Sequence, residues 1–595
     1  MRVAVTQFAT SSNPQENLVT CLRLIDKAAT CQPKLIVLPE FSNSLFSNTL
    51  ANESQGNDLQ SGYIDHNQAW YEALPLEGEF IKAIAAQAKK HHCYLVINVT
   101  LRRDKVREHQ DALVKSNISV CTCLFSPLGE LIHQQDKQAL TELENEFFIS
   151  SSLTTGVITT DEAKIGLLSG NDSLTFNAAR DLALSGATLL CNSISTCALD
   201  QTSFHDPARA FENNAFVITA NKIGSLVAQG KPQATAQVTF EPEQVSIHLG
   251  AGQSQIVSPC GKVQAKLMSN EEGFAFAELN LTGAGLDHKI RPDGTIFIKQ
   301  RREKLYQKLM CETADDKQSN VPITANVAIF ATYKSNEQAI EDVCHYIENN
   351  LSDIIQLPEL FFIADKTMTN DVDKRAEIAG LCEQLIEQVS SVLRPFQYLC
   401  TSLILNGNHQ AVLISEQGLI AKQSQLHLCQ RYQWTTLGDE LNIIELPLEQ
   451  GNIRLAMLTG DDATIPEIVD LAARQGIQVL LIAFDIQERS EVEYNLLSLA
   501  AENRICIVAA SREKSFANDR PTNNTSDNIY SKNKVKAQKS TGLIANLTIN
   551  SATKSALLPQ WQAPKFRGYS NQPLVKLQYG KITKAVIHPI AACDK

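Results

Sequence analysis

Blocks of apolar and polar residues alternate along the first part of the chain and predict strands and helices in turn. Residues 3–5 have strand character, and residues 13–16 give a helix start with an N-cap, a proline at the first helical position and a glutamate three residues after the cap. Residues 35–38 form a continuous apolar run of strand length, which indicates a strand buried on both faces. Because this run ends in Pro39-Glu40, the pattern places the Glu40 carboxylate at the exit of a buried strand.

The same order of elements returns in the second half of the chain. Residues 327–329 predict a strand, residues 335–338 a capping box, and residues 353–359 a strand that again ends in Pro-Glu. Two further stretches correspond between the halves, namely 164–190 with 453–481 and 208–221 with 500–511. A repeat this long indicates two homologous domains rather than a solenoid.

Polar stretches suggest how these domains are joined. Residues 312–322 are predicted to be a linker, and we place the boundary near residue 318, which gives domains 1–318 and 319–595. A second polar tract, residues 515–540, is predicted to be a mobile surface loop.

Composition narrows the classes of function. The 595-residue chain is 44% hydrophobic and 20% charged, which excludes a disordered or collagen-like protein. Its net charge of −12 argues against a nucleic-acid partner, because proteins that bind phosphate backbones concentrate Lys and Arg. No apolar run approaches the roughly 18 residues of a membrane span, and the first residues turn polar before a signal-peptide core could form. We therefore expect a cytoplasmic protein with no membrane partner.

The cysteines give no sign of a metal centre. The fifteen cysteines are scattered singly, apart from Cys121-x-Cys123, and this spacing predicts neither a zinc site nor an iron–sulfur cluster. In a reducing compartment they are expected to be mostly small buried hydrophobes. We predict no metal and no cofactor.

Five ordered motifs together resemble the nitrilase, or carbon–nitrogen hydrolase, superfamily. They are the LPE that ends at Glu40, the Lys137 that follows GELIHQQD, the IGLLSGND of residues 165–172, the RAxEN of residues 209–213 and the RREKLY of residues 301–306. The resemblance implies an α/β fold in which each domain is an αββα sandwich, with the two domains packed as an internal pseudo-dimer. It also implies acyl-transfer chemistry, in which a Glu base activates a Cys nucleophile and a Lys stabilises the charge that develops on the substrate.

Carried onto this sequence residue by residue, the resemblance leaves the nucleophile positions without a side chain. In the first half the base slot is Glu40 and the lysine slot is Lys137, but the cysteine slot is Gly170. In the second half the three slots hold Glu359, Gln425 or its neighbour Leu426, and Gly460. Because the groups of such a triad act only together, loss of the nucleophile costs on the order of 10⁶ in rate.

Neighbouring residues carry further expectations. Glu40 and Lys137 are predicted to form a buried ion pair, and Glu359, which has no lysine, to be protonated, solvated or paired with a group such as Arg431. Ser169 and Thr459 adjoin the glycines, but alternation along a strand predicts that their hydroxyls point away from the pocket. Cys191 is either a core residue or a relocated nucleophile.

Three functional hypotheses follow from these slots. The first is a pseudoenzyme that binds a small amide- or carboxylate-type metabolite, or that acts as a regulatory or scaffold protein with a protein partner or as a homo-oligomer. The second is a carbon–nitrogen hydrolase, an amidase or nitrilase, that uses an unconventional nucleophile such as Cys191 or a water activated by Glu40. The third is a purely structural partner of another protein, with vestigial pockets.

Overall fold

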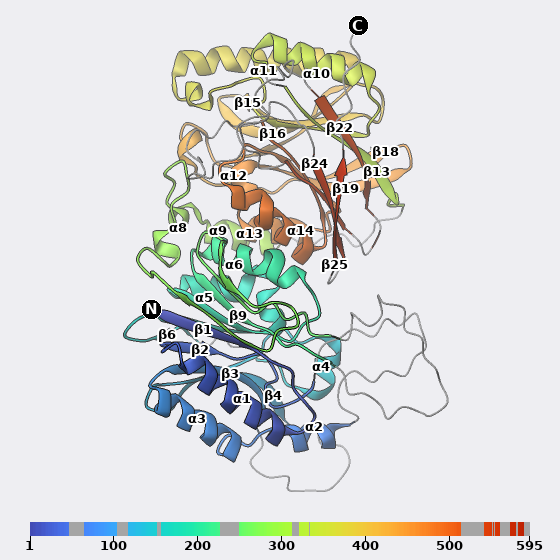
Figure 1. The fold of residues 1–595 in the computed structure, drawn as a ribbon. Coiled ribbons are helices and arrows are strands. Elements are labelled where there is room, and N and C mark those ends of the chain that lie inside the picture. The colour runs from blue at the N-terminus through green and yellow to red at the C-terminus, as the bar shows by residue number, and fades with distance from the viewer. Residues whose placement is uncertain are drawn as a thin grey trace, which may run out of the picture. The chain divides into compact units, whose positions relative to one another are not determined.

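The protein divides into two compact units, and each is described by itself (Figure 1). The computed structural model describes residues 1–46, 65–103, 117–151, 156–226, 249–311, 320–332, 334–512, 541–549, 551, 554–559, 572–578 and 581–587. Unit 1 is Met1–Lys289 and unit 2 is Ile290–Lys595. Residues 290–311 therefore belong to the second unit, although the sequence placed the boundary near residue 318. That boundary, most of the predicted linker and the whole of the 515–540 tract lie outside the described residues.

Unit 1 contains two six-stranded mixed sheets. The first has the order β12 (Gly273–Glu278), β1 (Arg2–Gln7), β2 (Leu35–Val37), β3 (Tyr94–Arg102), β4 (Ile118–Phe125), β5 (Leu131–Asp136). The second has the order β11 (Val263–Lys266), β10 (Gln255–Val257), β9 (Phe216–Ala220), β8 (Leu189–Ser193), β7 (Lys164–Ser169), β6 (Ile158–Thr159). Strands β1 to β3 and β7 to β9 run parallel, so their carboxyl ends lie at one edge of each sheet.

Helices cover the outer faces of both sheets of unit 1: α1 (Pro14–Ala29) and α3 (Glu79–His91) pack on the first sheet, and α5 (Phe176–Leu184) and α6 (Asp206–Asn213) on the second. The unit also contains α2 (His66–Glu72), α4 (Glu142–Phe147) and short turns at Gly170–Ser173, Gln201–His205 and Leu286–His288. As predicted, α1 begins with its N-cap, because the Asn13 side chain accepts a hydrogen bond from the Gln15 backbone N–H at 3.0 Å.

Three apolar clusters fix the layers of unit 1. One fills the space between the two sheets and includes Val5 and Ile165. Another lies beneath α1 and α3 and includes Ile84, and a third lies beneath α5 and α6 and includes Leu190. Helix, sheet, sheet and helix thus follow one another, which confirms the predicted α/β class for this unit.

The strand order of unit 2 follows that of unit 1 except at one edge of the second sheet. Its first sheet has the order β17 (Gly418–Ser424), β16 (Asn408–Ser415), β15 (Tyr398–Leu405), β14 (Ile354–Glu359), β13 (Thr324–Ala331), β22 (Thr541–Thr548). Its second sheet has the order β18 (Ile443–Leu448), β19 (Gly451–Thr459), β20 (Val479–Ala483), β21 (Cys506–Ala510), β23 (Lys554–Leu557), β24 (Gln572–Gln578), β25 (Lys581–Ile587). In unit 1 the strand beside β9 is antiparallel to it, whereas β23 runs parallel to β21.

The helices of unit 2 are α8 (Phe297–Gln300), α9 (Glu303–Met310), α10 (Glu337–Asn349), α11 (Val372–Val392), α12 (Gly460–Ala463), α13 (Pro466–Arg474) and α14 (Leu496–Asn503), with short turns at Lys366–Asn370, Gln430–Tyr432 and Glu491–Asn495. The predicted capping box at residues 335–338 is wrong: the N-cap of α10 is Asn336, whose side chain makes no cap hydrogen bond. Its φ of 55° takes the backbone out of the extended conformation that an N-cap normally has.

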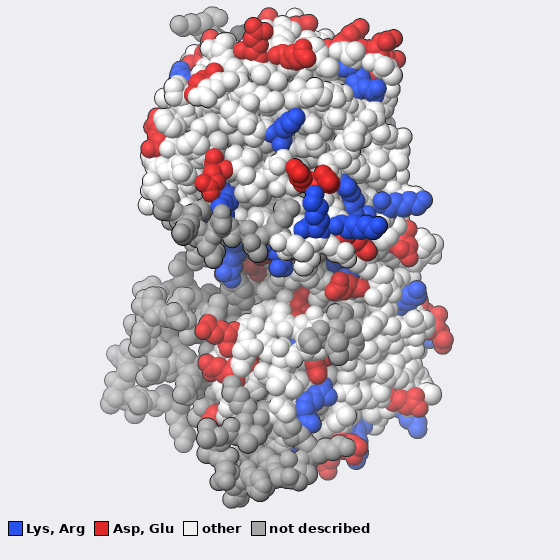
Figure 2. Space-filling view, turned by 180° about the vertical axis from the view of Figure 1, so that it is seen from behind, with Lys and Arg blue, Asp and Glu red and all other residues white. Residues whose placement is uncertain are grey.

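The surface agrees with the acidic composition. Figure 2 shows acidic side chains gathered at the end of unit 2 that α10 and α11 cover. Among the described helices, none is long and apolar enough to cross a membrane.

Candidate active-site residues in the two units

A buried acid–amine–acid cluster lies at the strand ends of unit 1. Glu40 follows β2 and Lys137 follows β5, and the Lys137 ammonium donates to the Glu40 Oε1 at 2.8 Å, which matches the predicted ion pair. The same ammonium donates to the Glu144 Oε1 at 2.6 Å. All three side chains are at most 1% exposed. One buried ammonium is thus shared by two buried carboxylates.

Sequence reasoning missed Glu144, although its neighbourhood carries a signal. Thr141 and Glu144 form a capping box at the start of α4, in which the Glu144 Oε2 accepts from the Thr141 backbone N–H at 2.9 Å. The T-x-x-E spacing predicts this helix start. It does not predict that the other carboxylate oxygen binds Lys137, because that contact depends on where α4 packs.

Burial and the neighbouring charges shift the pKa values of Glu40 and Lys137. Burial raises the pKa of Glu40 to about 7; the nearby Lys137 opposes this shift and Glu144 adds to it. For Lys137, burial acts to lower the pKa, but Glu144 and Glu40 outweigh burial and hold it above its usual value. The site thus combines an acid that titrates near neutrality with an amine that stays charged.

Gly170 lies directly beside this pair. It follows β7, and its φ of +49° lies in the left-handed region that glycine adopts at low cost. A Cβ atom built on Gly170 would lie 2.5 Å from the Glu40 Oε1 and 2.5 Å from the Lys137 Nζ. The backbone at the nucleophile slot therefore faces the acid and the amine, and no side chain separates them.

The prediction for Ser169 is wrong. Its hydroxyl lies 3.5 Å from the Glu40 Oε1 and accepts a hydrogen bond from the Asn98 Nδ2 at 2.7 Å. Alternation of side chains holds only between residues that both have extended backbone, and the left-handed turn at Gly170 ends that regularity. Ser169 and Gly170 therefore both face Glu40.

Cys191 lies in the apolar core between the two sheets of unit 1, where it packs with residues such as Ile165 and Ile218. Burial raises the pKa of its thiol far above the usual value. A nucleophilic cysteine needs an accessible thiolate, so this position suits a core residue.

A second buried amine, Lys222, also lies near the cluster. Its ammonium donates to the Ser44 carbonyl at 2.9 Å and lies 5.6 Å from the centre of the Phe41 ring. Burial lowers the pKa of Lys222 to about 7, while Glu40 and Cys21 oppose that shift. No motif in the sequence marks this lysine.

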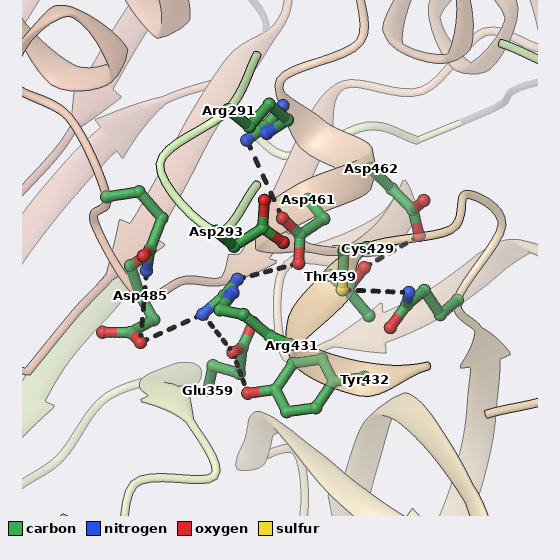
Figure 3. Close-up of polar contacts among 12 residues, drawn as sticks. Arg291, Asp293, Glu359, Cys429, Arg431, Tyr432, Thr459, Asp461, Asp462 and Asp485 are labelled. Carbon is green, nitrogen blue, oxygen red and sulfur yellow. Dashed lines mark hydrogen bonds and ion pairs between the residues drawn. The ribbon is translucent and has the colours of Figure 1, made fainter. Parts of the chain in front are cut away.

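In unit 2 an arginine supplies the charge that faces Glu359 (Figure 3). The Arg431 Nη1 lies 3.1 Å from the Glu359 Oε1, which confirms the predicted pairing, and the Tyr432 hydroxyl donates to the same oxygen. Arg431 also contacts Asp461 at 2.7 Å and Asp485 at 3.1 Å. One guanidinium thus contacts three buried carboxylates.

By its backbone contacts Gln425, and not Leu426, corresponds in position to Lys137 of unit 1. Asp462 accepts from the backbone N–H groups of Leu426 and His427, as Asp172 of unit 1 accepts from the two residues that follow Lys137. Gln425 donates to the His427 carbonyl at 2.7 Å, and its Oε1 lies 2.9 Å from the Nδ1 of the buried His409. The hydrogen bonds of the Gln425 amide therefore go to His427 and His409 and not to Glu359.

The second nucleophile slot faces an apolar side chain. A Cβ built on Gly460 would lie 2.7 Å from the Phe484 Cδ2, and Gly460 does not need a left-handed backbone. The adjacent Thr459 hydroxyl donates to the Asp462 Oδ2 at 2.8 Å. The glycine of unit 2 is thus turned away from its acid.

One group of described residues has ligand types suited to a metal. Atoms of Asp293, Cys429 and Asp461 lie within 4.8 Å of one another. However, Arg431 binds Asp461 and Arg291 lies 3.7 Å from it, so a cation there would meet two guanidinium groups. This charge balance does not favour a metal.

Residues 2–288, which make up nearly all of unit 1, match the family model described as carbon-nitrogen hydrolase. An amidase from Nesterenkonia sp. is 19% identical, with 52% of this chain and 95% of that chain covered and a TM-score of 0.37. The NitFhit protein of C. elegans is also 19% identical, with 47% of this chain and 61% of that chain covered and a TM-score of 0.36. Comparison with curated protein sequences gives no match.

Proposed function

We propose that the protein is a carbon–nitrogen hydrolase pseudoenzyme whose unit 1 retains the acid and the amine without the nucleophile. The observation that carries this proposal is the geometry at Gly170, where an added Cβ would lie 2.5 Å from both Glu40 and Lys137. Acyl transfer in this family proceeds through an attack by the group at that position. With only hydrogen there, the acid and the amine lack the side chain that makes this attack in the family.

We further infer that unit 2 is a degenerate second copy of the same domain. The matching strand order, the carboxylates of Asp172 and Asp462 on equivalent loops, and the positive φ of Phe41 and Leu360 immediately after each acid support this inference. Details of this kind recur when a domain is duplicated, because each one is a separate local requirement of the fold.

The retained cluster suits a small amide. An amide carbonyl accepts a hydrogen bond and its NH₂ group donates, and Lys137 and Glu40 offer the complementary donor and acceptor. A carboxylate would also accept from Lys137, but it would add negative charge beside Glu40 and Glu144. We therefore place amides ahead of carboxylates as ligands of a binding or regulatory protein.

Ammonia release tests the loss of catalysis. The full chain, incubated with a panel of aliphatic amides and nitriles, should release no more ammonia than the Glu40→Gln variant. Circular dichroism should show that both proteins are folded. Turnover that Glu40→Gln abolishes would contradict the proposal.

Binding of a small amide gives the matched positive test. Thermal shift with acetamide and propionamide then measures binding. A shift in the wild type that is reduced in Glu40→Gln supports a ligand role, and its absence supports a scaffold role.

A second candidate function is hydrolysis by a water that Glu40 activates. The pKa of Glu40, raised to about 7 by burial, favours it, because a general base works best near the operating pH. The ammonia assay separates the two functions, and a rate that rises as pH passes 7 would support the hydrolase.

A further inference from the structure

Residues 290–310, here called the clasp, belong to unit 2 and contact it through polar side chains along their whole length. The clasp includes α8 and α9. The contacting side chains come from Arg291, Asp293, Thr295, Gln300, Arg301, Arg302, Tyr306 and Lys308. A flexible linker would not be expected to make so many specific hydrogen bonds.

The first end of the clasp binds beside the second nucleophile slot. The Arg291 Nη1 donates to the Thr464 Oγ1 at 2.5 Å, and its Nη2 lies 3.3 Å from Glu491 and 3.7 Å from Asp461. The Arg291 side chain is only 6% exposed. This arginine is therefore a buried anchor rather than a surface charge.

The other end follows the loop after the lysine slot. The Arg301 Nε lies 3.0 Å from the Glu467 Oε1, and both side chains are about nine-tenths buried. Arg302 donates to the Leu426 carbonyl at 2.8 Å, and the Tyr306 hydroxyl lies 2.8 Å from the His427 Nε2. The clasp thus contacts the backbone that leads to Arg431.

The two units differ in charge at equivalent positions. The acids that receive the clasp in unit 2, Asp461, Glu467 and Glu491, correspond by strand order and spacing to Asn171, Asn177 and Gln201 of unit 1. Each carboxylate is thus replaced by a neutral amide in unit 1, of the same shape at Asn171 and Gln201 and one methylene shorter at Asn177. A segment that carries buried arginines is expected to prefer the acidic surface.

We propose that unit 2 is a docking module for an arginine-bearing segment, and that the clasp is its occupant. Arg291 and Arg301 provide the specificity, and the three acids form the receptor. The clasp thereby holds the segment that follows unit 1 against the rest of unit 2 through non-covalent contacts. This proposal does not depend on whether unit 1 is catalytic.

A nicked full-length protein tests the clasp. A protease site is inserted within residues 312–319, so that cleavage leaves the clasp on the first fragment and its receptor on the second. The two fragments should co-elute in gel filtration after cleavage. Separation of the wild-type fragments at micromolar concentration would overturn the proposal.

Charge reversal identifies the contact responsible. Arg301→Glu should weaken association on the order of 100-fold, because it breaks a buried pair and opposes two like charges. Glu467→Arg should do the same, and the double variant Arg301→Glu/Glu467→Arg should recover at least tenfold of the loss, which also excludes misfolding as the cause. Lys304→Glu, an exposed position on the clasp, is the matched control and should have no effect. Association that ignores Arg301→Glu would overturn the proposal.

Discussion

The two glycine slots differ in what surrounds them. Gly170 faces an intact acid–amine pair and needs a left-handed backbone, whereas Gly460 faces the Phe484 ring. In unit 2 the acid Glu359 is instead neutralised by Arg431, which comes from a different position on the loop than the lysine slot. The comparison teaches that a buried carboxylate needs a cationic partner, and that this partner can be a lysine in one unit and an arginine from a different loop position in the other.

The largest expected effect comes from removing the cation at each site. Arg431→Leu leaves Glu359, Asp461 and Asp485 without their shared partner and should cost about 3–5 kcal/mol in unit 2. Lys137→Met should cost unit 1 less, because the pKa of Glu40 is already raised to about 7 by burial, so that this acid can take up a proton. Urea unfolding followed by hydrogen exchange in peptides of each unit measures both.

Arg431→Lys is the control, because it keeps the positive charge but not the forked guanidinium. Its loss of stability should lie between zero and that of Arg431→Leu. An equal loss in Arg431→Leu and Lys137→Met would remove the contrast between the sites.

Adding a methyl group to each glycine gives the next largest difference. Gly170→Ala should cost about 2–3 kcal/mol, since alanine is strained at a φ of +49° and its Cβ would displace the Glu40–Lys137 pair. Gly460→Ala should cost about 1 kcal/mol, because only the Phe484 ring must move. Thermal unfolding of both variants with the same readout checks the order. A larger loss for Gly460→Ala would mean that the local geometry at these slots is different.

The acids of the two sites should give opposite pH dependence. Burial raises the pKa of Glu40 from 4.5 to about 7, so the folded state holds more protons in that range and the stability of unit 1 should fall as pH rises from 4.5 to 7. For Asp461, burial acts to raise the pKa, but Arg431 and Arg291 outweigh it and lower the pKa from 3.8 to about 2. Its contribution should be present above pH 3.8 and be lost toward pH 2.

Unit-resolved unfolding across pH 2–8 measures both trends. Glu40→Gln should flatten only the first and Asp461→Asn only the second. A stability of unit 1 that rises between pH 4.5 and 7 through Glu40 would contradict the assignment.

Site residues that are marked by local sequence features could be predicted, whereas contacts that depend on tertiary packing could not. Glu40 could be predicted from the buried strand that it follows, and Lys137 from the resemblance to the nitrilase superfamily. Charge balance named Arg431 as one of three ways to satisfy a buried Glu359, beside protonation and solvation. Glu144 and Lys222 could not be predicted, because their approach to Glu40 is set by tertiary packing.

The errors have equally local causes. Ser169 was predicted to point away because the alternation rule was applied across a strand end. The prediction for the α10 start failed because Asn336 takes a positive φ. Asparagine tolerates positive φ better than most residues, but its presence does not determine that it adopts this conformation. In the fold, the edge of the second sheet of unit 2 differs from that of unit 1, since β23 runs parallel where β10 runs antiparallel. The sequence motifs that the two units share do not specify the direction of this strand.

The hydroxyls beside the two glycines should give the smallest difference. Ser169→Ala removes the group that accepts from Asn98 and lies 3.5 Å from Glu40, and the loss of one buried acceptor should cost about 1–2 kcal/mol. Thr459→Val removes one donor to Asp462, which keeps its bonds from Leu426 and His427, so the cost should be below about 1 kcal/mol. Ser169→Ala should also shift the pH midpoint assigned to Glu40, whereas Thr459→Val should leave it unchanged. If neither substitution moves that midpoint, Ser169 does not contact Glu40 in solution.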